Sequence, residues 1–98
     1  MLKFKDLIFK DHNHMINAHH VFDNNWEISV SAGQGIYCTP REDLKDPKLF
    51  SSFEVAVIDP KGNFATGELL QLDDSVVGWQ GRNDIDNIIE MIEMIVSQ

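Results

Sequence analysis

The clearest pattern in the chain is an apolar stripe with helical spacing near its C-terminal end. Branched apolar residues recur there every three or four positions, and acidic residues occupy the opposite face; the stripe comprises Ile85, Ile88, Ile89, Ile92, Ile95 and Val96. Asn83 or Asp84 can cap the first turn, where acidic groups also suit the helix dipole. The pattern predicts an amphipathic helix over residues 84–96, with Asp86, Glu90 and Glu93 turned towards solvent.

Alternating apolar and polar residues predict strands in the earlier part of the chain. Residues 26–32 place an apolar side chain at every second position, which is typical of a half-buried strand. Residues 18–22 lead into Asp23-Asn24-Asn25, whose side chains favour a tight turn, so the two segments predict a hairpin. Residues 2–9 predict another strand, with a bulge near Asp6 where the apolar positions change parity.

A second hairpin is predicted further along the chain. Residues 53–58 are rich in β-branched side chains, turn-forming residues occupy 59–63, and residues 64–66 would return as a strand. One more short strand is expected within either 68–72 or 75–79. Thr39-Pro40-Arg41-Glu42 has capping-box spacing and predicts a short helical turn over residues 40–45.

Together these elements predict one α+β domain over residues 1–98. An antiparallel sheet of about four to six strands, formed by hairpins, would pack against one C-terminal amphipathic helix. At this length most large apolar side chains are needed for the core, so a deep enzyme pocket would compete with it. The size therefore favours a binding role over catalysis.

The charge of the chain is large and unevenly distributed. The net charge is −8, and residues 68–98 carry most of the excess, whereas residues 1–10 are net positive. Such a surface repels phosphate backbones and anionic membranes and favours basic partners, so we expect neither direct nucleic-acid binding nor membrane binding. The simpler alternative is that the charge serves solubility.

Cysteine content and hydropathy bear on the cellular location. Cys38 is the single cysteine, so the chain cannot form an internal disulfide, which fits a reducing compartment. Residues 1–11 contain no apolar run of signal-peptide length, and no window approaches the roughly 20 apolar residues of a membrane span. We therefore expect a cytoplasmic protein. Ile36 and Tyr37 beside Cys38 predict partial burial, which would leave the thiol unreactive.

Four histidines lie close together in the sequence, and they raise the hypothesis of a small metal-binding enzyme. Imidazole and carboxylate groups are ordinary ligands of zinc and similar metals, and the group comprises His12, His14, His19 and His20, with Asp11 and Asp23 near them. In an extended strand His19 and His20 point to opposite faces, and no cysteine pair or helical histidine pair supports them. A polar, partly exposed loop is the simpler interpretation, so we predict no metal site, no cofactor and no catalytic residue.

The candidate partner-binding residues lie in the C-terminal third of the chain. They are acidic residues with only Arg82 nearby, together with two methionines beside the isoleucine stripe: Asp73, Asp74, Asp86, Glu90, Glu93, Met91 and Met94. The carboxylates could imitate a row of phosphates, and methionines make adaptable contacts; the alternative is an ordinary solvated helix face. The apolar run Val76-Val77-Gly78-Trp79 could either cover the sheet or bind a second subunit.

Several short motifs occur in a characteristic order. They are Asp6-Leu7-Ile8-Phe9 followed by His12, residues 22–30, residues 53–58 with Gly62, the run at 76–79 and the acidic terminal helix. In these motifs the chain resembles a family of small, uncharacterised proteins encoded by tailed bacteriophages. The resemblance implies a context in which small proteins bind and modify host machinery, and acidic ones sometimes inhibit nucleic-acid enzymes by presenting DNA-like charge.

Three functional hypotheses follow from the sequence. The leading one is a non-enzymatic phage accessory protein that binds a host or phage protein, with an inhibitory effect if the acidic face mimics nucleic acid. The second is a self-associating structural or scaffold-like protein, such as a homodimer, that uses an exposed sheet edge or the run at 76–79. The third is a small metal-binding enzyme that uses the cluster from His12 to His20.

Overall fold

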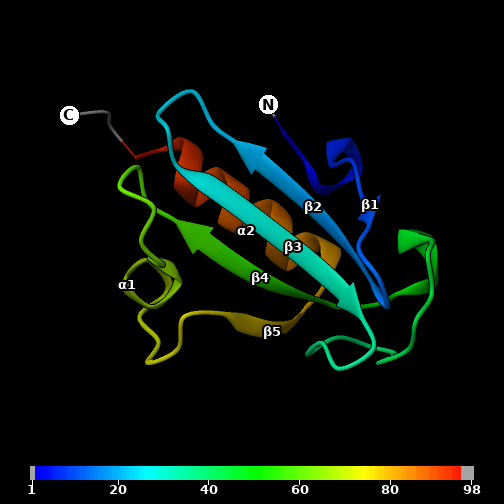
Figure 1. Ribbon diagram of the computed structural model, residues 1–98. Coiled ribbons are helices and arrows are strands. Elements are labelled where there is room, and N and C mark those ends of the chain that lie inside the picture. Colours follow the sequence, from blue (N-terminus) through cyan, green and yellow to red (C-terminus); the bar gives the residue numbers. More distant parts are fainter. Residues whose placement is uncertain (1, 96–98) are drawn as a thin grey trace.

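The computed structural model describes residues 2–95 and contains a five-stranded antiparallel sheet with a helix across one face (Figure 1). The strands are β1 (Lys10–Asp11), β2 (Met15–Val21), β3 (Glu27–Gly33), β4 (Phe53–Ile58) and β5 (Val77–Gln80), and they lie side by side in chain order. The α-helices are α1 (Thr66–Leu70) and α2 (Arg82–Glu93), and the 3-10 helices are η1 (Phe4–Asp6) and η2 (Pro47–Leu49). The predicted α+β fold, with hairpins packed against the C-terminal helix, is confirmed.

The core lies between the sheet and α2. Ile28, Val30 and Ala32 of β3 point to the same face because strand side chains alternate, and all three are fully buried. From α2, the isoleucines of the predicted stripe pack against them, and Ile85, Ile89 and Ile92 are also fully buried. Each such side chain stabilises the fold by roughly 1.5–3 kcal/mol relative to full exposure, so this contact fixes where α2 lies.

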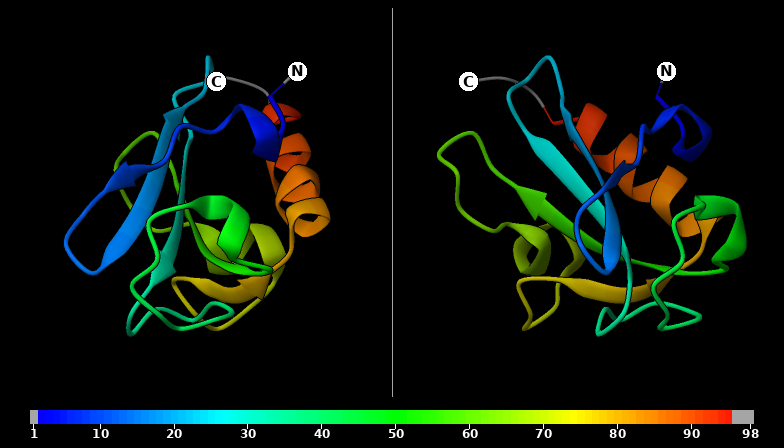
Figure 2. Two further views of the ribbon diagram at one scale, coloured as in Figure 1. Left: turned by 90° about the vertical axis from the view of Figure 1, so that its right-hand side faces the viewer. Right: turned by 45° about the vertical axis from the view of Figure 1, so that its right-hand side comes forward.

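The face of β3 that points away from α2 is polar. Asn17 of β2 donates hydrogen bonds from Nδ2 to Ser29 Oγ (2.8 Å) and to Ser31 Oγ (2.9 Å) on β3. Figure 2 (left) shows α2 beside only one face of these strands. The alternation of residues 26–32 predicted this division, because the polar members of the strand share the face away from α2.

The N-terminal segment departs from the predicted strand over residues 2–9. Residues 4–6 form the 3-10 turn η1 in place of a bulge near Asp6, and only Lys10–Asp11 joins the sheet, with Lys10 opposite Asn17. The physical reason lies in Phe4, whose ring packs 4.9 Å from the ring of Phe53 between centroids. Because Phe4 is buried in the core, residues 4–6 leave the plane of the sheet and pack against α2.

The second predicted hairpin is only partly present. β4 is confirmed, but the return strand at 64–66 is reduced to one bridge between Ile58 and Phe64, after which α1 begins. The hydroxyl of buried Thr66 takes the place of a strand, since it accepts the N–H of Val57 at 2.7 Å. On the side away from β3, the strand that pairs with β4 is β5 (Val77–Gln80), which lies close to the predicted position 75–79.

The helical turn predicted over residues 40–45 is wrong in position. Thr39 pairs with Ser52, and its carbonyl oxygen accepts the N–H of Ser51 at 2.9 Å in place of an N–H from the residues that follow it, so no helical turn begins at residue 40. The turn forms at Pro47–Leu49, where Asp46 caps it by accepting the N–H of Lys48 at 2.9 Å.

The predicted C-terminal helix is confirmed and begins two residues earlier than expected. Gly81 is the residue before the first turn, so Asn83 and Asp84 are not its cap; Asp84 accepts the N–H of Gly81 at 2.9 Å from inside that turn. The helix ends at Glu93, and Val96 of the predicted stripe lies outside the described residues.

Candidate functional site

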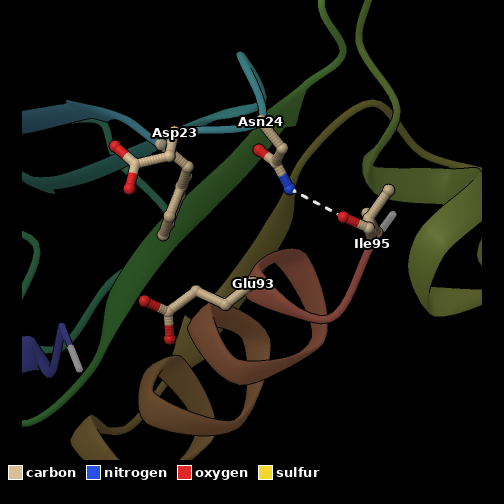
Figure 3. A pocket seen from close by; sticks show the side chains of 5 residues that line it. Asp23, Asn24, Glu93 and Ile95 are labelled. Atoms are coloured by element: carbon tan, nitrogen blue, oxygen red, sulfur yellow. Dashed lines mark hydrogen bonds between the residues drawn. The ribbon is translucent and has the colours of Figure 1, made fainter. Parts of the chain in front are cut away.

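The C-terminal end of α2 is held by the turn between β2 and β3. Asn24 in this turn donates hydrogen bonds from Nδ2 to the carbonyl oxygens of Ile92 (2.9 Å) and Ile95 (3.2 Å), as Figure 3 shows for Ile95. Its Oδ1 accepts the N–H of Trp26 at 3.0 Å, which fixes the turn itself. One amide side chain therefore bonds two carbonyls at the helix end, of which that of Ile92 also accepts the N–H of Ile95 at 3.1 Å, and it ties the turn to α2.

An acidic hollow lies between this turn and the last turn of α2. Its volume is about 210 Å³, and it is lined by Phe22, Asp23, Asn24, Glu93 and Ile95. Figure 3 shows the carboxylates of Asp23 and Glu93 extending to the same side. The last turn of α2 contains no basic residue, and no cation among residues 2–95 is within ion-pair distance of either carboxylate.

Four of the predicted partner-binding residues are exposed at the C-terminal end of α2 or directly after it, and one of them, Glu93, lines this hollow. Glu90 and Glu93 are exposed, Met91 is 39% exposed and Met94 is 73% exposed. Asp86 does not belong with them. It is half-buried, and its Oδ1 accepts the N–H of Phe4 at 2.7 Å, so it anchors η1 to α2 in place of facing a partner.

Asp73 and Asp74 are exposed but lie elsewhere, in the loop between α1 and β5. Figures 1 and 2 place this loop at the start of β5, away from the C-terminal half of α2. Gly67 of α1 allows the loop to fold back closely, since a Cβ there would meet the carbonyl oxygen of Leu72 at 2.6 Å. The predicted acidic residues therefore form two separate surfaces.

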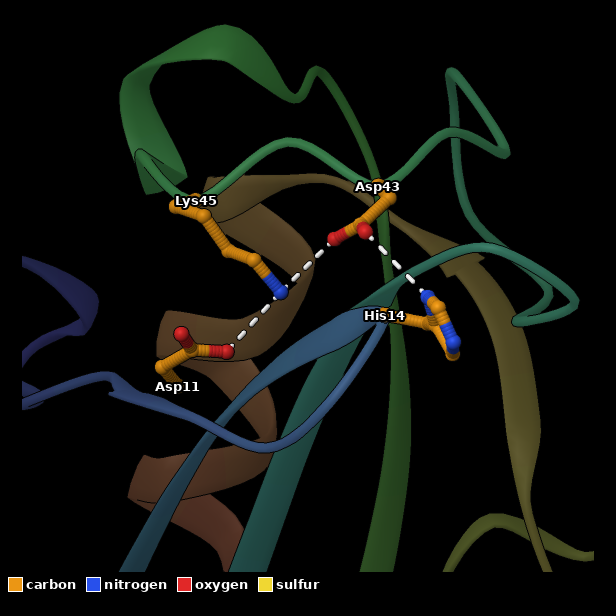
Figure 4. A network of polar contacts seen from close by, with 4 residues as sticks. All are labelled: Asp11, His14, Asp43 and Lys45. Atoms are coloured by element: carbon orange, nitrogen blue, oxygen red, sulfur yellow. Dashed lines mark hydrogen bonds and ion pairs between the residues drawn. The ribbon is translucent and has the colours of Figure 1, made fainter.

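His14 belongs to a polar network that joins two loops (Figure 4). Asp43 lies between His14 Nδ1 (3.3 Å) and Lys45 Nζ (2.7 Å), and Lys45 also contacts Asp11 at 2.8 Å. Hydrogen bonding to Lys45, followed by that to His14, holds the pKa of the Asp43 carboxyl below its usual range, and the two carboxylates raise the pKa of Lys45. The network ties the turn after β1 to the long loop before β4.

The other histidines have unrelated environments. His19 pairs with Glu27 on the polar face of the sheet, whereas His20 is half-buried and packs edge-on against Phe22 at 4.8 Å. His12 and His19 line one surface hollow, but the part of the chain that the structure describes holds no group of three or more side chains that could share a metal ion. Strand alternation sends His19 and His20 to opposite faces, as the sequence predicted.

Cys38 is buried, in agreement with its apolar flanks. Its Sγ accepts the N–H of Gly33 at 3.3 Å in the turn after β3, and burial raises the pKa of its thiol. A thiol that is buried and protonated is a poor nucleophile. Cys38 therefore serves as a packing residue of the core.

The run at 76–79 divides between core and surface. Val77 packs against the core, whereas Trp79 is 57% exposed and adopts a left-handed φ of 53°, an uncommon conformation for a bulky residue. Its ring stacks on Tyr37 at 5.3 Å, and the guanidinium of Arg41 lies 5.3 Å from the Tyr37 ring on the same loop. Sequence reasoning missed this aromatic pair because its members lie 42 positions apart in the chain.

Within residues 2–95, no helix has the length and apolar character needed to cross a membrane.

The residues that build the acidic hollow come from the β2–β3 turn and from the end of α2, and only Glu93 was predicted to bind a partner. The sequence pattern assigned Asp23 and Asn24 to the hairpin turn, and Asp23 also to the surroundings of the histidines, since nothing in their local pattern reveals a contact with α2. Comparisons with protein-family models, with curated proteins and with solved structures find no match to this chain.

Proposed function

We propose that the protein is a non-enzymatic binding protein whose acidic hollow docks a basic segment of another protein. The observation that supports this proposal is the accumulation of carboxylates at the C-terminal end of α2. Glu90 and Glu93 lie in its last turns, and Asp23 of the hairpin lines the hollow together with Glu93. The C-terminal end of a helix already carries partial negative charge, so each carboxylate there is unfavourable by about 0.3–1 kcal/mol.

A lysine or arginine side chain from a partner would relieve this repulsion. Its charged end would contact Asp23 and Glu93, and its methylene groups would lie along Phe22 and Ile95, which also line the hollow. Met91 and Met94 beside it supply flexible apolar contact that tolerates different partner surfaces. Electrostatic recognition of this kind raises the association rate and the specificity more than it raises the affinity, and it weakens with added salt.

The partner class follows from the same charge. Proteins that act on nucleic acids expose basic grooves, and an acidic helix end can occupy such a groove in place of phosphates. The resemblance to small phage proteins supports a host or phage enzyme of this class as the target, with inhibition as the outcome. The interaction would take place in the host cytoplasm.

Affinity capture with charge-reversed variants tests the proposal. The protein would be used to capture partners from lysate of infected or host cells, alongside the double variants Glu90→Lys/Glu93→Lys and Asp73→Lys/Asp74→Lys. Both variants change the charge equally, but only the first alters the end of α2. We expect the first to lose the captured protein and the second to keep it. Equal capture by all three forms would refute the acidic-hollow mechanism.

A second candidate function, self-association, is favoured by the aromatic pair. Trp79 and Tyr37 are both about half exposed although their rings are large, and Trp, Tyr and Arg are the residues most enriched at the centres of protein interfaces. Light scattering across concentration, with Trp79→Ser for comparison, tests it. A dimer that dissociates in Trp79→Ser would support a homodimer, whereas a monomer at every concentration would remove this candidate.

A further inference from the structure

A second hollow, of opposite charge, lies at the N-terminal end of α2. Its volume is about 280 Å³. Four apolar residues form its wall: Phe4, Leu7, Phe9 and Pro47. Its rim is basic and is formed by Lys5, Lys48 and Arg82. These residues come from the N-terminal segment, η2 and α2, so no single stretch of the sequence reveals the site.

The hollow is shaped by specific contacts. The guanidinium of Arg82 donates to the carbonyl oxygen of Pro47 at 2.9 Å and lies 5.1 Å from the centre of the Phe4 ring. Phe4 and Phe9 pack with their ring centroids 5.7 Å apart. The hydrogen bond from Phe4 N–H to Asp86 fastens the same segment to α2. The aromatic part of the wall and the guanidinium of Arg82 are therefore held in place by the fold.

Positive charge is concentrated here on an otherwise acidic protein. With Lys3, which lines an adjoining hollow, the rim accounts for four of the eight basic residues of the chain. The carboxylates nearest in the chain each accept a backbone N–H: Asp6 from Lys3, Asp46 from Lys48, Asp84 from Gly81 and Asp86 from Phe4. Within residues 2–95, no carboxylate is within ion-pair distance of Lys5, Lys48 or Arg82.

We propose that this hollow binds an acidic peptide segment that carries one apolar anchor residue. The anchor would fill the space against Phe4 and Phe9, and flanking carboxylates would pair with Lys5 and Lys48. The lining supports a peptide anchor, because the apolar wall takes one apolar side chain and the basic rim takes the carboxylates on either side of it. The site goes beyond the proposed function, since it lies at the other end of α2 and selects the opposite charge.

Amide NMR spectra of the full chain, titrated with short peptides, test the proposal. The probe is acetyl-Glu-Phe-Glu-amide, compared with acetyl-Lys-Phe-Lys-amide and acetyl-Glu-Ala-Glu-amide. We expect the first peptide to shift amides of residues 4–9, 48 and 82, and the other two to bind about tenfold more weakly or not at all. Lys5→Glu/Lys48→Glu should weaken binding by about tenfold or more, whereas Lys61→Glu, a charge reversal in the distant turn after β4, should not.

Several outcomes would overturn the proposal. Shifts confined to other residues, or equal binding of the Lys-Phe-Lys peptide, would exclude an acidic ligand here. Equal binding of hexanoate would indicate a small-molecule site. Shifts of the same amides with protein concentration alone would identify a second copy as the occupant. Lys5→Gln/Lys48→Gln, which removes the charge without reversing it, repeats the test if the glutamate variant does not fold.

Discussion

Replacing Asn24 by aspartate tests whether the turn between β2 and β3 holds the end of α2. Asn24 donates two hydrogen bonds to helix carbonyls, of Ile92 and Ile95, and accepts one from Trp26. Aspartate has nearly the same shape and keeps the acceptor. It removes both donors, however, and sets a carboxylate against two carbonyl oxygens at the negative end of the helix.

The expected loss of stability follows from these contacts. Two hydrogen bonds contribute about 0.5–1.5 kcal/mol each, and a misplaced charge at a helix end costs about 0.3–1 kcal/mol. Because Asn24 is only half-buried, water can replace part of the loss, so we expect the free energy of unfolding to fall by about 2 kcal/mol. For a domain of this size that corresponds to a decrease in Tm of about 10 °C.

Urea unfolding followed by circular dichroism at neutral pH measures this effect. Asn25→Asp is the matched control, since Asn25 is the exposed neighbour and receives the same charge; we expect a change within about 0.5 kcal/mol. The Asn24→Asp penalty should shrink as the pH falls from neutral towards about 4, because the carbonyls raise the pKa of the new carboxyl above its ordinary value and its protonation removes the repulsion. Equal urea midpoints for the two variants at neutral pH would refute the role assigned to Asn24.

Three further predictions test other parts of the structure. Thr66→Val leaves the N–H of Val57 without its buried acceptor and should cost about 1–3 kcal/mol. Thr66→Ser keeps the hydroxyl and should cost about 1 kcal/mol, the value of the lost methyl group. A valine variant as stable as wild type in urea would contradict the role of Thr66 as the acceptor of the Val57 N–H. Gly78→Ala places a Cβ 2.6 Å from that of Tyr37, which should separate Tyr37 from Trp79 at a cost of about 1–3 kcal/mol; an unchanged tryptophan emission spectrum would count against it. Lys45, followed by His14, lowers the pKa of Asp43, so its contribution is present above the ordinary carboxyl pKa and is lost as the pH falls through the lowered value. Asp43→Asn should therefore lose less stability than wild type as the pH falls below about 4, and parallel stability curves would exclude this effect.

Local periodicity was sufficient to predict the elements that carry the core. The isoleucine spacing predicted α2, and the alternation in residues 26–32 predicted β3 and its polar outer face. Both patterns arise because an element buried on one side repeats its apolar residues with its own period. The hairpin at Asp23-Asn24-Asn25 was predictable for a similar reason, since those residue types suit a tight turn.

The errors arose where distant segments compete for the same surface. Asp86 occupies a polar position on the helix, yet it binds Phe4 because the N-terminal segment folds over α2. Residues 64–66 have strand-like side chains, but Thr66 instead supplies a hydroxyl to Val57. The two hollows at the ends of α2 are each assembled from separate stretches of chain, so neither was visible in any local pattern.

Isothermal titration with a basic peptide is the most direct test of recognition by the acidic hollow. The probe is acetyl-Lys-Leu-Lys-Leu-amide, titrated into wild type, Asp23→Asn/Glu93→Gln and the control Asp73→Asn/Asp74→Asn, which removes two exposed carboxylates from the separate loop. We predict that the first variant binds about tenfold more weakly than wild type and that the control binds as wild type does. Equal affinity for all three forms, or a loss only in the control, would contradict recognition by the hollow between the β2–β3 turn and α2.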